Sequence, residues 1–268
     1  MFVHGREAYR RNSFLVLYTF YKNVLYISTQ WYFGFWSAFS GQPLYEPFIY
    51  QLYNVTMTSF PIMYFACFDF EYLKDEFLER PLLYKIGLNH ECYSVKNFLQ
   101  YVLYGLWHAS ILYLTGYQAL LKSGQTMDDG KEFGIDVAGN HVYVVCILVA
   151  NYIVVQRCNN YTGFGEMLTA LMCFAAFFFM YVQSAFDMKF PQLYLIFGPM
   201  YTQSSIWVSM FLGIIQAWVF EFFVSRFSTL ISPHLDWKKW SFKGNDFEEL
   251  GEESSKNEGG NVSEVNQD

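Results

Sequence analysis

The sequence has few charges and lacks the signatures of common enzyme sites. Only 15% of its 268 residues are Asp, Glu, Lys or Arg. No Gly-rich phosphate loop, dinucleotide motif, protease motif or glycosidase motif is present, so we expect no catalytic residues in this chain. The five cysteines and five histidines have no metal-ligand spacing, which argues against a metal site. No disulfide is expected either.

Long apolar runs rich in aromatic residues make up most of the chain. Hydrophobic residues form 53% of the sequence and aromatic residues 22%. Runs near 20 residues suit helices that cross a hydrocarbon core of ~30 Å, and they are too long for the ~10-residue strands of a membrane barrel. The sequence therefore predicts an all-α, polytopic membrane protein. Its six transmembrane helices are expected at about 14–39, 46–70, 98–120, 141–157, 165–186 and 204–227.

The expected organisation has three parts. A cytoplasmic segment covers 1–13, a six-span membrane domain covers 14–230, and a cytoplasmic tail covers 231–268. Lysine and arginine gather in the segments on one side of the predicted membrane, and the positive-inside rule makes that side cytoplasmic. The tail after Gly244 is acidic and has few apolar residues, a composition typical of disorder. We therefore expect both termini in the cytoplasm.

Lys22 lies near the middle of the first apolar run. A lysine at that depth costs at least about 2.5 kcal/mol to insert, so it usually faces other helices or a polar path. The alternative is that its stem extends toward the cytoplasmic headgroups, although a depth of about 12 Å is long for that reach. Lys22 therefore indicates transport or a buried ion pair.

Polar residues in the first two runs are expected to form one site near the middle of the membrane. The short connection at 40–45 predicts an antiparallel helix pair, which would bring these residues within several ångströms of one another. The candidate substrate-binding residues are Lys22 and Asn23 in the first run and Asn54, Thr58 and Ser59 in the second. The alternative is that they only form hydrogen bonds between helices.

Pro61 lies inside the second run and cannot donate a backbone hydrogen bond. The carbonyl of Met57 is therefore freed, and the helix is expected to kink. A free carbonyl beside Thr58 would suit a ligand, whereas the alternative is a tolerated kink. Asp69 and Glu71 end this run, where carboxylates usually cap the helix or pair with basic residues.

The residues VHGREAYRRNSFLVLYTFYKN, FSGQPLYEPF and LYNVTMTSFPI resemble the type IV P-type ATPases, the phospholipid flippases. The resemblance covers nearly the whole chain and is most specific over the first 60 residues. It implies that the six runs are the fifth to tenth spans of a ten-span flippase, with Arg6 to Asn12 in the stalk. The chain departs from the family at Phe68-Asp69-Phe70-Glu71, where the family tends to have Leu/Phe-Asp-Gln-Asp.

This resemblance also implies a function. Lys22 and Asn54 would lie along the headgroup path of a phospholipid that moves from the exoplasmic to the cytoplasmic leaflet, with Asn23, Thr58 and Ser59 as further candidates. The family's Asp-Lys-Thr-Gly phosphorylation loop, nucleotide domain and actuator domain are absent from this sequence. ATP hydrolysis is therefore expected only in a complete enzyme that includes a missing N-terminal ATPase portion.

The expected partners follow from the same resemblance. They are the phospholipid, the bilayer of the plasma membrane or an endomembrane, and an accessory two-span β-subunit, with no nucleic acid. ATP and Mg²⁺ are implied for the complete enzyme, and no cofactor is expected in this chain itself. Two alternatives remain open: a stand-alone six-span channel or carrier, and a non-catalytic membrane scaffold.

Overall fold

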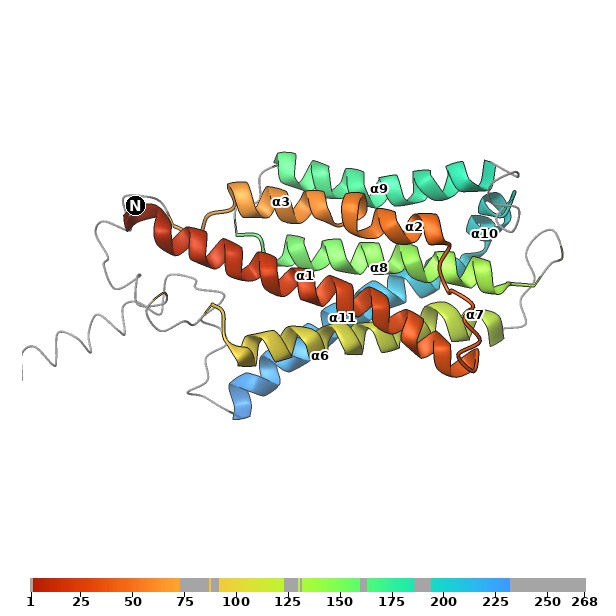
Figure 1. Cartoon of the computed structure of the whole chain (residues 1–268), viewed down its shortest axis with the longest axis horizontal. Helices are drawn as coiled ribbons and strands as arrows, with labels where there is room; N and C mark the ends of the chain where they lie inside the picture. The colour runs from red at the N-terminus through yellow and green to blue at the C-terminus, as the bar shows by residue number, and fades with distance from the viewer. Residues whose placement is uncertain are drawn as a thin grey trace, which may run out of the picture. The chain divides into compact units, whose positions relative to one another are not determined.

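The computed structural model describes residues 2–72, 87, 92–122, 130, 132–159, 163–185 and 194–231, except for the side chains of residues 2, 3 and 225–231. These residues form helices joined by turns, so the all-α class is confirmed for them (Figure 1). The acidic tail lies outside the described residues from 232 onward. The helices are α1 (Phe2–Trp36), α2 (Pro47–Leu52), the π-helical η1 (Tyr53–Met57), α3 (Ser59–Phe68), α6 (Val95–Leu112), the π-helical η3 (Tyr113–Gln118), α7 (Ala119–Lys122), α8 (Ile135–Arg157), α9 (Gly163–Ala185), α10 (Phe197–Thr202) and α11 (Ser204–Ile231).

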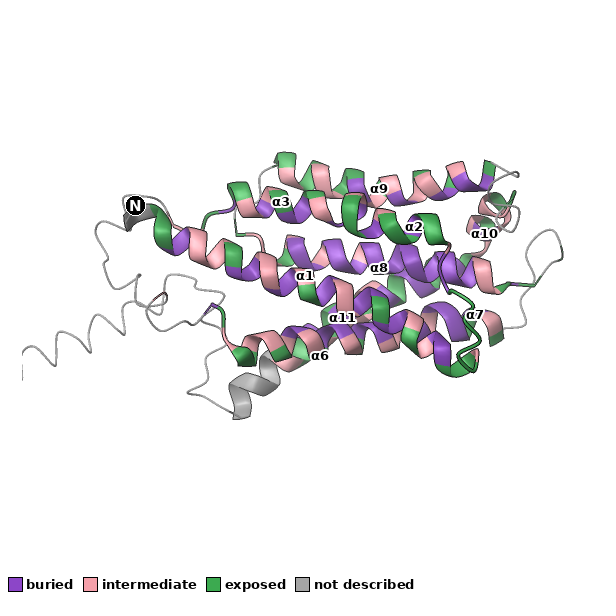
Figure 2. Cartoon of the chain, in the orientation of Figure 1, coloured by how far each residue is buried: buried purple, intermediate pink, exposed green. Residues whose placement is uncertain are grey.

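The chain divides into two compact units, Met1–Trp218 and Val219–Asp268. Within the first unit α8 is the central helix, because it packs against α1, α3, α6, α9 and η3. It is buried along most of its length, whereas α9 is largely exposed (Figure 2). Close approach requires small residues: a Cβ on Gly139 of α8 would lie 2.1 Å from the carbonyl oxygen of Leu44. The described part of the second unit is the end of α11.

Three helices are long and apolar enough to cross a membrane: α8, α9 and the Ser204–Val224 part of α11. The other three predicted spans coincide with α1, with the series α2, η1 and α3, and with the series α6, η3 and α7. These three segments are less uniformly apolar or less regularly α-helical. The first begins with a charged segment, and each of the other two is interrupted by a π-helical turn. The six-span topology remains a prediction.

Helix boundaries differ from the predicted ones in two places. The cytoplasmic segment and the first span form one continuous helix, α1, which ends at Trp36. It ends there because Ala38 and Phe39 have positive φ angles of 51° and 53°, and the N–H of Phe39 donates to the carbonyl of Gly34 at 2.8 Å. At the other boundary, α8 begins at Ile135, before the predicted 141, and protein packing buries Val137, Ala138 and Asn140 in its first turns.

Candidate functional site

Lys22 on α1 points into the protein, where it is 5% exposed. Its Nζ donates a hydrogen bond of 2.9 Å to Oγ1 of Thr58, a fully buried residue between η1 and α3. The same nitrogen lies 5.9 Å from the ring centroid of Tyr18, a distance at which a cation–π attraction is weak. Among the side chains that the structure describes, no carboxylate forms an ion pair with Lys22. Within the described part of the chain, a positive charge on Lys22 is therefore stabilised by neutral groups.

Two further hydrogen bonds fix the orientation of this contact. The Thr58 hydroxyl donates to the carbonyl of Tyr53 at 2.8 Å, which leaves its lone pairs to accept from Lys22. The phenol of Tyr53 donates in turn to the backbone carbonyl of Lys22 at 3.0 Å. Tyr53, Thr58 and Lys22 thus form a closed set of contacts between α1 and η1. Within this set, the Lys22 ammonium and the Thr58 hydroxyl are held together inside the protein.

The helix that carries Thr58 is interrupted at the place where Pro61 predicts a disturbance. The Thr58 N–H bonds to the carbonyl of Tyr53 at 3.2 Å, a π-helical spacing of five residues. Pro61 cannot donate to the carbonyl of Met57. This carbonyl instead accepts a 3.1 Å hydrogen bond from Nδ2 of Asn151 on α8, so the acceptor that the sequence left free for a ligand has a partner within the protein.

Asn151 was missed by reasoning from the sequence. It reads there as one of several polar residues, with Asp136, Asn140 and His141, in the run IDVAGNHVYVVCILVANYIVV. The signal that could have found it is the unpaired carbonyl itself, because a buried acceptor needs a donor from elsewhere. A proline inside one helix and a buried asparagine on another helix are therefore a pair worth seeking in membrane sequences.

The other predicted site residues are less closely associated with Lys22. Asn54 is exposed, while Asn23 and Ser59 are half-buried. The Ser59 hydroxyl donates to the backbone carbonyl of Asn54, again across five residues. The spacing argument assumed a continuous α-helix, and the π-helical turn changes the register between Asn54 and Thr58. The structure thus joins Lys22 to Thr58 and leaves the side chain of Asn54 on the outer face of η1.

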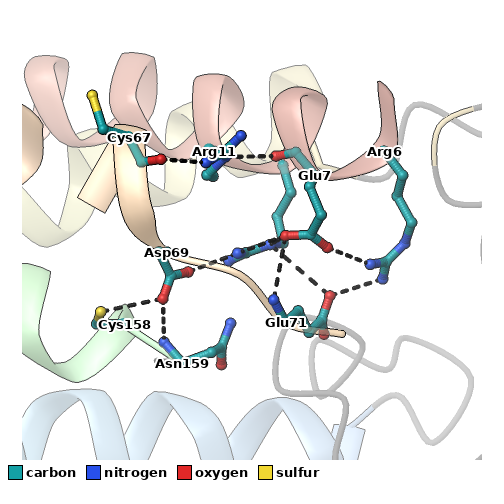
Figure 3. Close-up of polar contacts among 9 residues, drawn as sticks. Arg6, Glu7, Arg11, Cys67, Asp69, Glu71, Cys158 and Asn159 are labelled. Carbon is teal, nitrogen blue, oxygen red and sulfur yellow. Dashed lines mark hydrogen bonds and ion pairs between the residues drawn. The ribbon is translucent and has the colours of Figure 1, made fainter. Parts of the chain in front are cut away.

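A second polar group surrounds the start of α1 (Figure 3). We call it the ionic cluster, and its members are Arg6, Glu7, Arg10, Asp69 and Glu71. Arg6 pairs with Glu7 at 2.9 Å and with Glu71 at 2.8 Å. Arg10 pairs with Glu7 at 3.0 Å and with Asp69 at 2.6 Å. These pairs join α1 to the end of α3 and the residues that follow it.

Asp69 extends the ionic cluster to the turn after α8. Its Oδ1 accepts from the thiol of Cys158 at 3.2 Å and from the N–H of Asn159 at 2.9 Å, while Oδ2 faces Arg10 (Figure 3). Burial raises the pKa of Glu71 above its ordinary value, and the positive charges of Arg6 and Arg10 offset this only in part. Every member of the cluster has at least one partner of opposite charge. The cluster is therefore a structural junction of three chain segments.

Among the residues that the structure describes, no three His, Cys, Asp or Glu side chains are grouped so that they could hold a metal ion. These residues thus offer no donor set for the Mg²⁺ that the resemblance implies. The ionic cluster does not change this, because its carboxylates are neutralised by arginines.

Comparison with known proteins gives a consistent result. The family model described as "Phospholipid-translocating P-type ATPase C-terminal" matches residues 1–234. Phospholipid-transporting ATPase C887.12 of Schizosaccharomyces pombe is 28% identical over 213 residues, which are 78% of this chain and 17% of that protein. Phospholipid-transporting ATPase ID of Homo sapiens is 27% identical over 222 residues, 79% of this chain and 18% of that protein. Phospholipid-transporting ATPase DRS2 of Saccharomyces cerevisiae is 36% identical over 115 residues, 42% of this chain and 8% of that protein.

The chain therefore spans less than a fifth of the length of each of these relatives. The family model runs from the start of α1 to just beyond α11, and the apolar helices fit an integral membrane protein. The resemblance found in the sequence is confirmed: the chain belongs to the C-terminal membrane family of the phospholipid-translocating P-type ATPases.

Proposed function

We propose that this chain is the membrane half of an ATP-driven translocase that moves phospholipid from the exoplasmic to the cytoplasmic leaflet. The observation that carries the proposal is the buried Lys22, whose Nζ has a hydroxyl partner and no acid partner among the described side chains. A phospholipid headgroup carries an anionic phosphate, and an isolated charge is very costly in hydrocarbon. A lysine at this depth would lower that cost while the phosphate passes.

The positions of the five candidate residues suggest how the path is arranged. Lys22 and Thr58 would form its interior, because both are buried and hydrogen-bonded to each other. Asn54 would contact the headgroup from the exposed face of η1, with Ser59 and Asn23 at intermediate depth. The acyl chains would stay in the surrounding lipid. The first two predicted spans would thus supply one part of the path, and the spans that this chain lacks would supply the remainder.

The remaining parts of the proposal come from the family. The matched relatives are named phospholipid-transporting ATPases and are several times longer than this chain. Phosphorylation, ATP and Mg²⁺ would belong to the portion of a complete enzyme that this chain lacks, and a two-span β-subunit would accompany it. Both termini would lie in the cytoplasm of a cell whose plasma membrane or endomembrane holds the protein.

The test uses the complete polypeptide that carries this chain, purified and reconstituted in liposomes. Lys22→Ala removes the buried ammonium, and the matched control Lys122→Ala removes an exposed lysine at the end of α7. A hydrogen bond to a charged group contributes about 1.5 to 3 kcal/mol, so the lipid concentration for half-maximal ATPase stimulation is expected to rise about tenfold or more in Lys22→Ala only. Equal lipid stimulation in both variants would contradict the headgroup path and would favour the scaffold alternative.

A further inference from the structure

At the break between α2 and α3, the backbone carbonyls of Tyr53, Asn54 and Met57 accept from donors that a regular α-helix would not supply. The carbonyl of Tyr53 accepts from Thr58, and that of Asn54 accepts from the Ser59 hydroxyl. Both donors belong to the broken helix itself. The carbonyl of Met57 is the one whose donor comes from another helix, through Nδ2 of Asn151 on α8. This bond therefore joins the break to α8.

The same bond fixes the orientation of the peptide group between Met57 and Thr58. The oxygen of this peptide accepts from Asn151 at 3.1 Å, and its N–H donates to Tyr53 at 3.2 Å. A peptide group is planar, so two hydrogen bonds at its opposite ends determine how it is turned. The Cα of Thr58 is the next atom in the chain. Its side chain, which accepts from Lys22, is aimed by the peptide group that Asn151 holds.

The burial of Asn151 makes a packing role alone a poor account of this residue. Asn151 has an exposed fraction of 0%. Its Nδ2 bonds the Met57 carbonyl and approaches Sγ of Cys173 at 3.7 Å, while its Oδ1 has no hydrogen-bond partner within the described residues. Burying an amide with one unpaired oxygen is unfavourable. The bond to Met57 is the interaction that offsets this penalty.

We infer that Asn151 is a positioning residue for the headgroup site: it holds the Met57–Thr58 peptide so that the Thr58 hydroxyl meets the ammonium of Lys22. Asn151 acts through the backbone and contacts neither Lys22 nor the lipid. This inference rests on the proposed function, because it assigns a role to the contact between Lys22 and Thr58. It adds α8, a later predicted span, to a path formed by the first two.

The experiment is a double-mutant cycle in the complete reconstituted polypeptide. Asn151→Leu replaces the amide with an apolar group of similar size, and Asn140→Leu is the control on the same helix. In the parent protein, Asn151→Leu is expected to raise the lipid concentration for half-maximal ATPase stimulation about fivefold, while Asn140→Leu leaves it unchanged. In a Thr58→Val background the hydroxyl is already gone, so Asn151→Leu is expected to change this concentration by less than about twofold.

If Asn151→Leu raised the lipid concentration for half-maximal stimulation by the same factor in the parent protein and in Thr58→Val, the inference would be overturned. Asn151 would then act independently of Thr58. If Asn151→Leu does not fold, Pro61→Ala provides the second variant. Alanine restores an N–H at position 61 that can bond the Met57 carbonyl. The double variant that combines Asn151→Leu with Pro61→Ala is therefore expected to fold. A double variant that also fails to fold would overturn the inference. Failure of the proposed function is distinguishable, because it would appear as normal lipid stimulation in Lys22→Ala, whatever Asn151→Leu does.

Discussion

Two buried cation sites on the same helix have opposite surroundings. Near its start, α1 carries Arg6, which is 4% exposed and pairs with Glu7 and Glu71. Further along, α1 carries Lys22, which is 5% exposed and donates to the hydroxyl of Thr58. Burial is thus the same at the two places, and the number of acidic partners is different. The difference separates a cation held by carboxylates from one held by a hydroxyl.

The energetic consequence differs accordingly. Breaking a buried ion pair leaves a charge without compensation, so each member of the ionic cluster is needed by its partners. Lys22 has no acid that depends on it among the described side chains, and its burial is unfavourable in itself. Stability therefore explains the two arginines and leaves Lys22 without a structural reason. The proposed anionic headgroup would supply that reason.

The largest effect is expected from Asp69→Ala. This change removes an ion pair to Arg10 and the Oδ1 acceptor that serves both Cys158 and Asn159. Removing one partner of a buried pair typically costs about 3 to 5 kcal/mol. The measurement is thermal unfolding of the detergent-solubilised protein, followed by loss of the monodisperse peak in size-exclusion chromatography.

Asp69→Asn is the matched control, because it keeps one oxygen acceptor and the shape while it removes the charge. It is expected to unfold at a temperature between those of the parent protein and Asp69→Ala. If Asp69→Ala unfolds at the same temperature as the parent protein, the ionic cluster is not a structural junction and the comparison fails.

A smaller effect of opposite sign is expected from Lys22→Met. Methionine keeps the length of the lysine stem and removes the charge, which lowers the cost of burial at this depth by up to about 2.5 kcal/mol. The lost hydrogen bond to Thr58 offsets part of this gain. The same unfolding measurement is expected to show an unchanged or higher unfolding temperature. A fall as large as that of Asp69→Ala would mean that Lys22 is structural after all.

Sequence reasoning located the helices well and their interruptions less well. Apolar runs of helical length gave segments that coincide with α9 and α11, because hydropathy alone decides such boundaries. The helix α8 begins at Ile135, before the predicted span at 141, since hydropathy cannot show that protein packing buries the residues around Asn140. Pro61 indicated a kink, yet the π-helical turn at η1 depends on hydrogen bonds across five residues that no local pattern predicts.

The candidate site shows the same limit at the level of residues. Lys22 and Thr58 could be paired from depth along antiparallel helices, and they lie in contact. Asn54 could not be assigned to a face, because the register change between it and Thr58 is invisible in the sequence. Asn151 comes from a distant helix, and only the three-dimensional structure brings it to Met57. Local spacing thus identified the pair within two neighbouring helices and missed the residue that holds it from outside.

The smallest effect is expected from Arg11→Ala. This change tests whether acidic partners, rather than position on α1, distinguish the ionic cluster from Lys22. Arg11 lies one residue after Arg10, is only half-buried, and donates to the carbonyls of Cys67 at 2.8 Å and Glu7 at 3.4 Å. Exposed cation contacts typically contribute less than about 1 kcal/mol. Arg11→Ala is therefore expected to leave the unfolding temperature nearly unchanged in the same measurement. A fall in unfolding temperature close to that of Asp69→Ala would show that substitutions anywhere in the first part of α1 destabilise the protein. The acidic partners would then not be what distinguishes the ionic cluster from Lys22.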